Sequence, residues 1–192
     1  LDLPKRPQTL PRNVLTVAEA EAVLAVPDVG DPLGPRDRAI LEVLYSTGMR
    51  RMELAGLRVS DIDRDRGTVL IRQGKGKKDR VVPIGERAVT WVDRYTESAR
   101  PRLVIGDAGD TLFLTHFGLP FTTDRLSDLV AGYIDRADVG KRGSCHTFRH
   151  TMATLLLEAG ADIRFIQVML FFNDTATTEI YTQVSIRALV EV

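Results

Sequence analysis

Two histidines and an arginine lie close together in the sequence His146-Thr147-Phe148-Arg149-His150. On a helix, residues three and four positions apart share a face, so these three side chains can point into one site. An imidazole can exchange a proton near neutral pH, and a guanidinium can hold an oxyanion through two hydrogen bonds. Taken alone, however, the cluster is more typical of a capped, partly buried helix start than of a functional site.

His146 and His150 also have the spacing of two zinc ligands on one helix. The metalloprotease pattern needs Glu after the first His, and Thr147 stands there. His116 is the one other histidine of the chain, so a third ligand would have to be a carboxylate. Arg149 inside the cluster would repel a cation. We expect no metal and no cofactor, with a zinc hydrolase as the weaker hypothesis.

Three more residues could do chemistry. Arg50 follows the sequence Thr-Gly-Met, in which Gly48 is expected to end a helix, and its planar side chain could hold a phosphate. Lys75 lies in a run of Gly and Lys that lacks the nucleotide-binding P-loop pattern. Tyr181 follows Thr-Thr-Glu-Ile and could act as a covalent nucleophile. Each of these residues taken alone is also typical of a solvated surface or of packing.

Apolar periodicity and capping residues predict the elements that position these side chains. Helices are expected at about residues 17–26, 35–47, 53–57, 86–98, 123–137, 145–159 and 162–170. The β-rich runs 68–72 and 80–84 flank the Lys75 segment and predict an antiparallel hairpin, and 111–114 predicts a further short strand. The predicted fold class is α+β, mostly α, with a helical domain and a small antiparallel sheet.

Composition limits the function classes. The chain has 192 residues, 44% hydrophobic and 27% charged, which is ordinary for a soluble globular domain. No apolar run is long enough to cross a bilayer, so we expect no membrane partner. A single cysteine, Cys145, excludes an internal disulfide and suits a reducing cytoplasm. The net charge is zero, but residues 36–80 hold 12 Lys and Arg against 7 Asp and Glu, which would allow a local basic face.

The order of these motifs along the chain resembles the tyrosine recombinase, or phage integrase, family, and most of all its Xer-like bacterial members. The resemblance spans roughly residues 15–189. It implies that Tyr181 is the nucleophile that forms a 3′-phosphotyrosyl link with DNA. It also implies that Arg50 and Arg149 hold the phosphate, that Lys75 is the hairpin lysine, and that His146 assists proton transfer.

The same resemblance implies supporting residues and partners. Glu53 and His150 would support the catalytic residues, and Lys77 and Arg80 would contact DNA. The partner would be double-stranded DNA, on which a homo- or hetero-tetramer works in the bacterial cytoplasm without a cofactor. Residues 14–192 would form the catalytic domain. The proline-rich residues 1–13 would link it to a missing N-terminal DNA-clamping domain.

One position departs from the family pattern. The family usually has Leu-Gly-His before the tyrosine segment, whereas this chain has Leu170-Phe171-Phe172. Phe172 stands where the phosphate-contacting His is expected, and a phenyl ring cannot donate a hydrogen bond. Residues 171–182 also resemble a translated sequencing adapter, so the departure is either a biological change or a sequence error. The alternative hypothesis is a catalytically impaired DNA-binding module derived from a recombinase.

Overall fold

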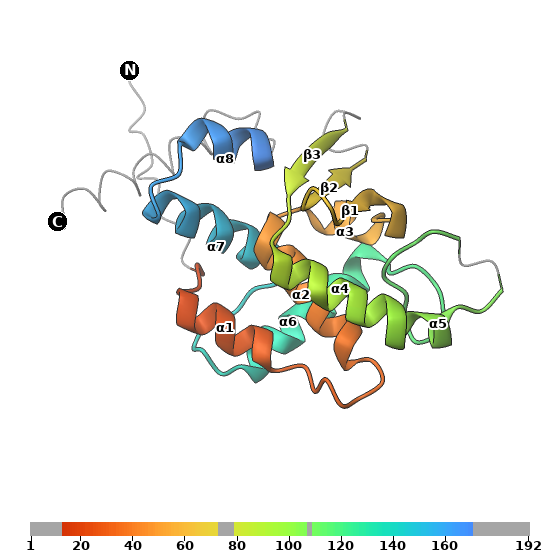
Figure 1. Ribbon diagram of the computed structural model, residues 1–192. Coiled ribbons are helices and arrows are strands. Elements are labelled where there is room, and N and C mark those ends of the chain that lie inside the picture. The colour runs from red at the N-terminus through yellow and green to blue at the C-terminus, as the bar shows by residue number, and fades with distance from the viewer. Residues whose placement is uncertain (1–12, 73–78, 107–108, 171–192) are drawn as a thin grey trace, which may run out of the picture.

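Helix α2 (Gly34–Thr47) lies at the centre of the protein and is buried along most of its length. The structure is a computed structural model that describes residues 13–72, 79–106 and 109–170. In it, α2 packs against α1 (Val17–Ala25), α4 (Glu86–Ser98) and α7 (Cys145–Glu158), which surround it in Figure 1. One core of buried apolar residues runs from α1 through to α8 (Ile163–Leu170).

The remaining helices cover the ends of this core. Helix α3 (Arg51–Ala55) follows α2 after a sharp turn and packs on α6 (Thr123–Arg136), which also contacts α1 and α7. Helix α5 (Arg100–Leu103) continues from α4, and α8 packs on α7 and on strand β3 (Arg80–Pro83). No helix in the described part of the chain is long and apolar enough to cross a membrane.

A small antiparallel sheet packs beside α3. It has the order β1-β2-β3, with β1 (Ile62–Asp63), β2 (Thr68–Ile71) and β3 (Arg80–Pro83), and a 3-10 turn at Val59–Asp61 precedes it. The register of β2 and β3 pairs Thr68 with Pro83 and Ile71 with Arg80, so the predicted hairpin is confirmed. The mostly helical fold class with a small antiparallel sheet is confirmed as well (Figure 1).

Local capping signals set several helix ends as predicted. Thr16 and Glu19 form the expected capping box at α1: the Glu19 N–H donates to Thr16 Oγ1 over 3.2 Å, and the Thr16 N–H donates to Glu19 Oε2 over 2.7 Å. Asp162 caps α8 by accepting the Arg164 N–H over 2.8 Å. Gly160, with φ +85°, follows α7 in the left-handed conformation expected of it.

Four short elements differ from the predictions. Helix α3 begins at Arg51 instead of about residue 53, because the Glu53 carboxylate accepts the Arg50 N–H and caps the helix earlier. The strand predicted at 111–114 is wrong, since Thr111 and Leu114 form only isolated bridges, to Arg58 and Pro120. Helix α5 and strand β1 were not predicted, because four and two residues are too few to show a periodicity.

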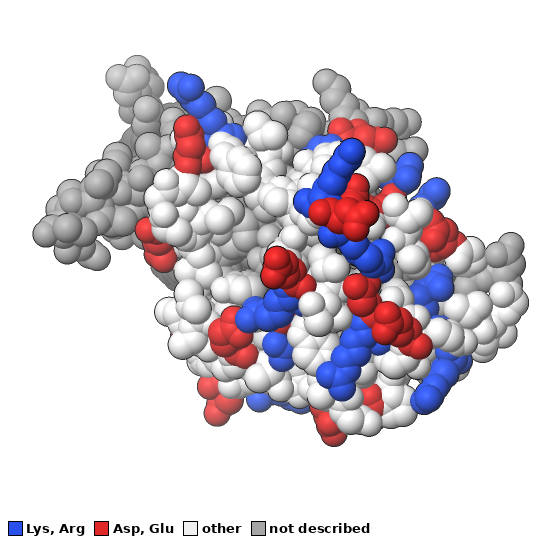
Figure 2. Space-filling model, in the orientation of Figure 1, with Lys and Arg blue, Asp and Glu red and all other residues white. Residues whose placement is uncertain are grey.

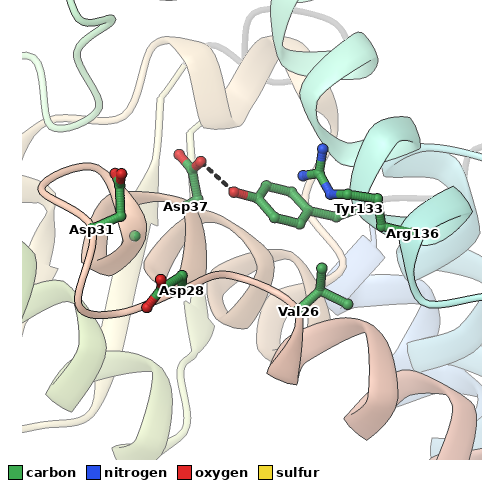
Figure 3. A pocket seen from close by; sticks show the side chains of 7 residues that line it. Val26, Asp28, Asp31, Asp37, Tyr133 and Arg136 are labelled. Carbon is green, nitrogen blue, oxygen red and sulfur yellow. Dashed lines mark hydrogen bonds between the residues drawn. The ribbon is translucent and has the colours of Figure 1, made fainter.

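A buried polar contact joins α2 to α6. The Tyr133 hydroxyl donates to Asp37 Oδ2 over 2.5 Å, and burial followed by this contact raises the pKa of the phenol. Figure 3 shows the pair at the edge of a hollow of about 260 Å³, into which the Arg136 guanidinium also turns. The hollow is lined by Val26, Asp28, Asp31, Gly34, Asp37, Tyr133 and Arg136. None of the candidate catalytic residues lines it.

The face that presents α4 carries both charge signs side by side. Figure 2 shows Lys and Arg interspersed with Asp and Glu over α1, α4 and the neighbouring segments. Many of these charges are paired: Arg87 contacts Glu21 and Glu42, each at 2.9 Å, and Arg64 contacts Asp93 at 2.6 Å. The Arg87–Glu21 and Arg64–Asp93 pairs are largely exposed and contribute little stability, so we interpret this face as a solvated surface.

Gly48 allows the sharp turn between α2 and α3. Its φ is +59°, a conformation that side chains with a Cβ rarely adopt, and it closes α2 by donating its N–H to Leu44 O. The space around it is also full. A Cβ at Gly48 would lie 2.3 Å from Met152 Cε and 2.8 Å from Leu170 Cδ2. The left-handed backbone therefore restricts this turn to glycine, and an added Cβ would also have to displace the ends of the Met152 and Leu170 side chains.

We predict that Gly48→Ala lowers the free energy of unfolding by about 2–5 kcal/mol, the sum of a left-handed backbone penalty and overpacking. Gly140→Ala is the matched control, because Gly140 has φ +70° but a Cβ added there would meet no atom within 4 Å. The control should lose only about 1–2 kcal/mol. Urea unfolding of the three proteins measures both values, and equal losses would contradict the packing argument.

Candidate active site

Arg149 projects from α7 toward the end of α2 and the last described residue of α8. Arg149 is only 5% exposed, and its Nη1 donates to the Gly48 carbonyl over 2.7 Å. Its Nη2 donates to the Leu170 carbonyl at the last residue of α8. A buried charge is tolerated only where hydrogen bonds satisfy it, so these carbonyls hold the guanidinium in one orientation.

Arg50 lies two residues beyond Gly48 and is the N-cap residue, directly before α3. Its side chain is 25% exposed, and its Nη1 lies 3.2 Å from Glu53 Oε1. The Arg50 N–H donates to Glu53 Oε2 over 2.8 Å. The Gly48 turn thus places Arg50 close to the end of α2, where Arg149 binds the Gly48 carbonyl.

Glu53 is the acidic centre of this region. Burial alone would raise the pKa of its carboxyl group. The hydrogen bonds from Arg80 and from the Arg50 N–H, together with both positive charges, outweigh that effect and lower the pKa below its ordinary value. Glu53 is therefore an anion at neutral pH, as a residue that supports arginines should be.

Arg80 contacts protein groups in the described structure. Its side chain is 7% exposed, and it donates to both oxygens of Glu53, over 2.7 and 2.8 Å. Its Nε donates to the Met169 carbonyl over 3.1 Å. The direct DNA contact expected of Arg80 from sequence stays a prediction. The structure shows that this guanidinium also binds Glu53 and Met169. Sequence reasoning missed these contacts, because both partners lie far from Arg80 along the chain.

His146 stands at the exposed start of α7, near both arginines. Partial burial of the ring lowers its pKa first, and the positive charges of Arg51, Arg149 and Arg50 lower it further. His146 lies one turn before Arg149 on α7, and Arg149 donates to the carbonyl of Gly48, two residues before Arg50. The fold therefore brings these three residues to one region.

His150 lies one turn further along α7 and is half-buried. Burial lowers its pKa first, followed by the charges of His146 and Arg149. Both imidazoles are therefore neutral above pH 6.5, the ordinary value for histidine. A neutral imidazole can accept a proton, which an imidazolium cannot.

Arg51 is a site residue that sequence reasoning did not single out. Its Nη1 donates to Ser127 Oγ on α6 over 3.1 Å and lies 3.6 Å from Asp124. Of the charges that lower the pKa of His146, that of Arg51 has the largest effect. The available signal was the pair of consecutive arginines after Gly48, of which only the first matched a motif.

The other predicted residues lie outside the described part of the chain. These are Lys75, Lys77, Phe172 and Tyr181. Among the described residues, no three His, Cys, Asp or Glu side chains come together as metal ligands, so the zinc hypothesis gains no support from them. What the described residues do form is a pair of guanidiniums beside a neutral imidazole. That arrangement can hold an oxyanion and accept a proton next to it.

The chain matches the model of the phage integrase family over residues 13–187. It is 51% identical over 189 residues to tyrosine recombinase XerC 2 of Ralstonia nicotianae, covering 98% of this chain and 54% of that protein. It is 42% identical over 185 residues to tyrosine recombinase XerD of Pseudomonas aeruginosa, covering 96% of this chain and 61% of that protein. The chain therefore spans less than two thirds of the length of these relatives.

Solved structures agree with this likeness. The crystal structure of XerA recombinase has a TM-score of 0.80 and 34% identity, covering 99% of this chain and 65% of that one. XerH site-specific recombinase, bound to its difH substrate before cleavage, has a TM-score of 0.77 and 27% identity, covering 94% of this chain and 52% of that one. Family model, relatives and fold agree, and the chain belongs to the phage integrase family of tyrosine recombinases.

Proposed function

We propose that this chain is the catalytic domain of a site-specific recombinase, which cleaves and rejoins DNA strands through a 3′-phosphotyrosyl intermediate. The observation that carries the proposal is the meeting of Arg50, Arg149 and His146 around the end of α2. Two arginines can neutralise a phosphodiester without a metal ion, because each offers a planar set of donors. The family to which the chain belongs uses this chemistry on DNA.

In the proposed reaction, the Tyr181 oxygen attacks the scissile phosphorus and loses its proton to neutral His146. A bond from the tyrosine oxygen to phosphorus forms as the bond from phosphorus to the 5′ oxygen breaks. Lys75 protonates that leaving oxygen, giving a free 5′-hydroxyl. Arg50 and Arg149 stabilise the charge on the non-bridging oxygens in the transition state. A 5′-hydroxyl of a partner strand reverses the step, so the bond energy is conserved and no ATP is consumed.

The partner is double-stranded DNA, and the XerH complex with difH DNA supports this choice. We propose that residues 14–192 form the catalytic domain, that residues 1–13 lead from a DNA-clamping domain, and that Lys77 contacts the DNA backbone. Strand exchange between two sites requires four active tyrosines, so the working form would be a homo- or hetero-tetramer on DNA. The curated relatives are bacterial, which favours action on DNA in a bacterial cytoplasm.

One observation favours a second candidate function, a DNA-binding module with little cleavage activity. Phe172 stands where the family has a phosphate-contacting His, and it cannot donate a hydrogen bond. Both candidates predict DNA binding, whereas only a recombinase forms a covalent link to DNA. Covalent trapping therefore separates them.

We expect the parent chain to form a covalent adduct with a nicked suicide substrate and Tyr181→Phe to form none while still binding DNA. The reason is that phenylalanine lacks the oxygen that attacks phosphorus. Tyr45→Phe is the matched control, because Tyr45 packs edge-on against Phe148 at a centroid distance of 6.4 Å, inside the fold. Denaturing gels measure the adduct. An adduct that persists in Tyr181→Phe would refute the nucleophile, and a parent chain without an adduct would favour the binding module.

Arg51→Ala should raise the pKa of His146, because it removes the positive charge that most disfavours the imidazolium. Proton NMR of the histidine Cε1–H signal against pH measures the shift, and the acidic limb of the cleavage-rate profile should move to higher pH with it. Arg64→Ala is the control, because Arg64 is bound to Asp93 on another part of the surface. An unchanged His146 titration in Arg51→Ala would show that Arg51 does not act on this ring.

Phe172→His should increase single-turnover cleavage by about tenfold to a hundredfold, because one added donor to the transition-state phosphate is worth a few kcal/mol at most. Phe172→Leu is the control, since it also removes the phenyl ring but adds no donor. The same suicide substrate serves for all three proteins. Equal rates for the His and Leu variants would mean that position 172 does not contact the phosphate.

A further inference from the structure

Arg80 is held between two parts of the candidate site. It projects from β3, and its Nη1 and Nη2 donate to Glu53 Oε1 and Oε2 over 2.7 and 2.8 Å. Its Nε donates to the Met169 carbonyl over 3.1 Å. With its side chain 7% exposed, the guanidinium makes these contacts away from bulk water, where such bonds are strongest.

The Glu53 carboxylate links Arg80 to Arg50 through hydrogen bonds. Oε1 accepts from Arg80 Nη1 and from Arg50 Nη1, and Oε2 accepts from Arg80 Nη2 and from the Arg50 N–H. A carboxylate has about four lone-pair directions, so these donors occupy it fully. Because every direction is used, Glu53 cannot rotate without breaking a bond, and the backbone and side chain of Arg50 are fixed relative to Arg80.

The same guanidinium also contacts helix α8 near the last residues of it that the structure describes. Arg80 donates to the Met169 carbonyl and Arg149 donates to the Leu170 carbonyl. Along the sequence, the segment that contains Phe172 and Tyr181 follows directly after this point.

We propose that Arg80 is a positioning residue for the recombinase reaction: through Glu53 it orients Arg50, and through the Met169 carbonyl it holds α8 in place beside Arg149. The inference rests on the proposed function of the site. Lysine could replace it only in part, because an ammonium group keeps the charge but cannot make two parallel bonds to a carboxylate together with a third bond to a carbonyl. The role differs from the direct DNA contact that the sequence suggested for Arg80.

A matched control exists elsewhere in the fold. Arg38 donates from Nε and Nη2 to Glu42 Oε1 over 2.9 and 2.8 Å, and from Nη1 to the Leu24 carbonyl. Arg38 therefore has the same kind of partners as Arg80: one buried carboxylate and one carbonyl near a helix end. It lies ten residues before Gly48 on α2, about 15 Å along the helix axis. Losing it should affect folding without affecting Arg50.

The first test compares Arg80→Ala, Arg80→Lys and Arg38→Ala with the parent chain. The readouts are single-turnover cleavage of a suicide substrate at saturating DNA, and the Kd for the same duplex. We expect Arg80→Ala to slow cleavage by about a hundredfold, because a small misplacement of a catalytic group has that effect. Arg80→Lys should recover part of this rate, the Kd should change less than threefold, and Arg38→Ala should cleave at the parent rate.

The second test does not depend on cleavage. The side-chain Nε–Hε signal of Arg50, assigned by its loss in Arg50→Lys, is followed by NMR in the folded, DNA-free proteins. Arg80→Ala should shift or broaden this signal, and Arg38→Ala should leave it in place. An unchanged Arg50 signal in Arg80→Ala would overturn the proposal. If the parent chain forms no adduct, the proposed function fails for this chain, and the NMR result alone decides the role of Arg80.

Two other outcomes would overturn the proposal, and a third would support it. A weaker Kd for Arg80→Ala, with a salt dependence reduced by about one phosphate contact and an unchanged rate at saturating DNA, would show a direct DNA contact. Equal rate losses in Arg80→Ala and Arg38→Ala would show a general contribution to folding. A slower rate with an unchanged Kd and a displaced Arg50 signal would support positioning.

Discussion

The site depends on one physical requirement: the buried charge of Arg149 needs hydrogen-bond acceptors. Removing a guanidinium from water is costly unless protein groups replace the lost hydration. The carbonyls of Gly48 and Leu170 provide two such acceptors, one at the end of α2 and one on α8. The left-handed turn at Gly48 and the packing of α8 on α7 can be understood as conditions for this single contact.

The arginines also explain the electrostatics of the site. Arg50, Arg51 and Arg149 all lower the pKa of His146, so their charges converge on one region. Glu53 balances part of this charge while it is held by Arg50 and Arg80, which keeps its own pKa low. A positive region beside a neutral imidazole favours binding of a polyanion such as a DNA backbone, because the phosphate charges are attracted to the arginines.

The contacts that the sequence predicted join residues close together in the chain, whereas the contacts that it did not predict join residues far apart. The capping box at Thr16, the cap at Asp162 and the hairpin between β2 and β3 depend on neighbours a few residues away, so their patterns are visible in the sequence. The shared face of His146 and Arg149 follows from helical spacing. The contacts of Arg80 do not, because Glu53 lies 27 residues before it and Met169 lies 89 residues after it. Lys75 and Tyr181, outside the described residues, stay predictions.

The long range of the site contacts has a consequence for the order in which the site is assembled. The contact of Arg149 with Gly48 closes a loop of 101 residues, and that of Arg80 with Met169 closes one of 89. Long loops close late, because local structure must form first and their closure costs chain entropy. A nascent chain that has folded only α1, α2 and the sheet therefore lacks its second arginine and the end of α8. Nearly the whole domain must therefore be synthesised before Arg50 and Arg149 can bind a phosphate together. A chain truncated before α7 cannot form the complete site.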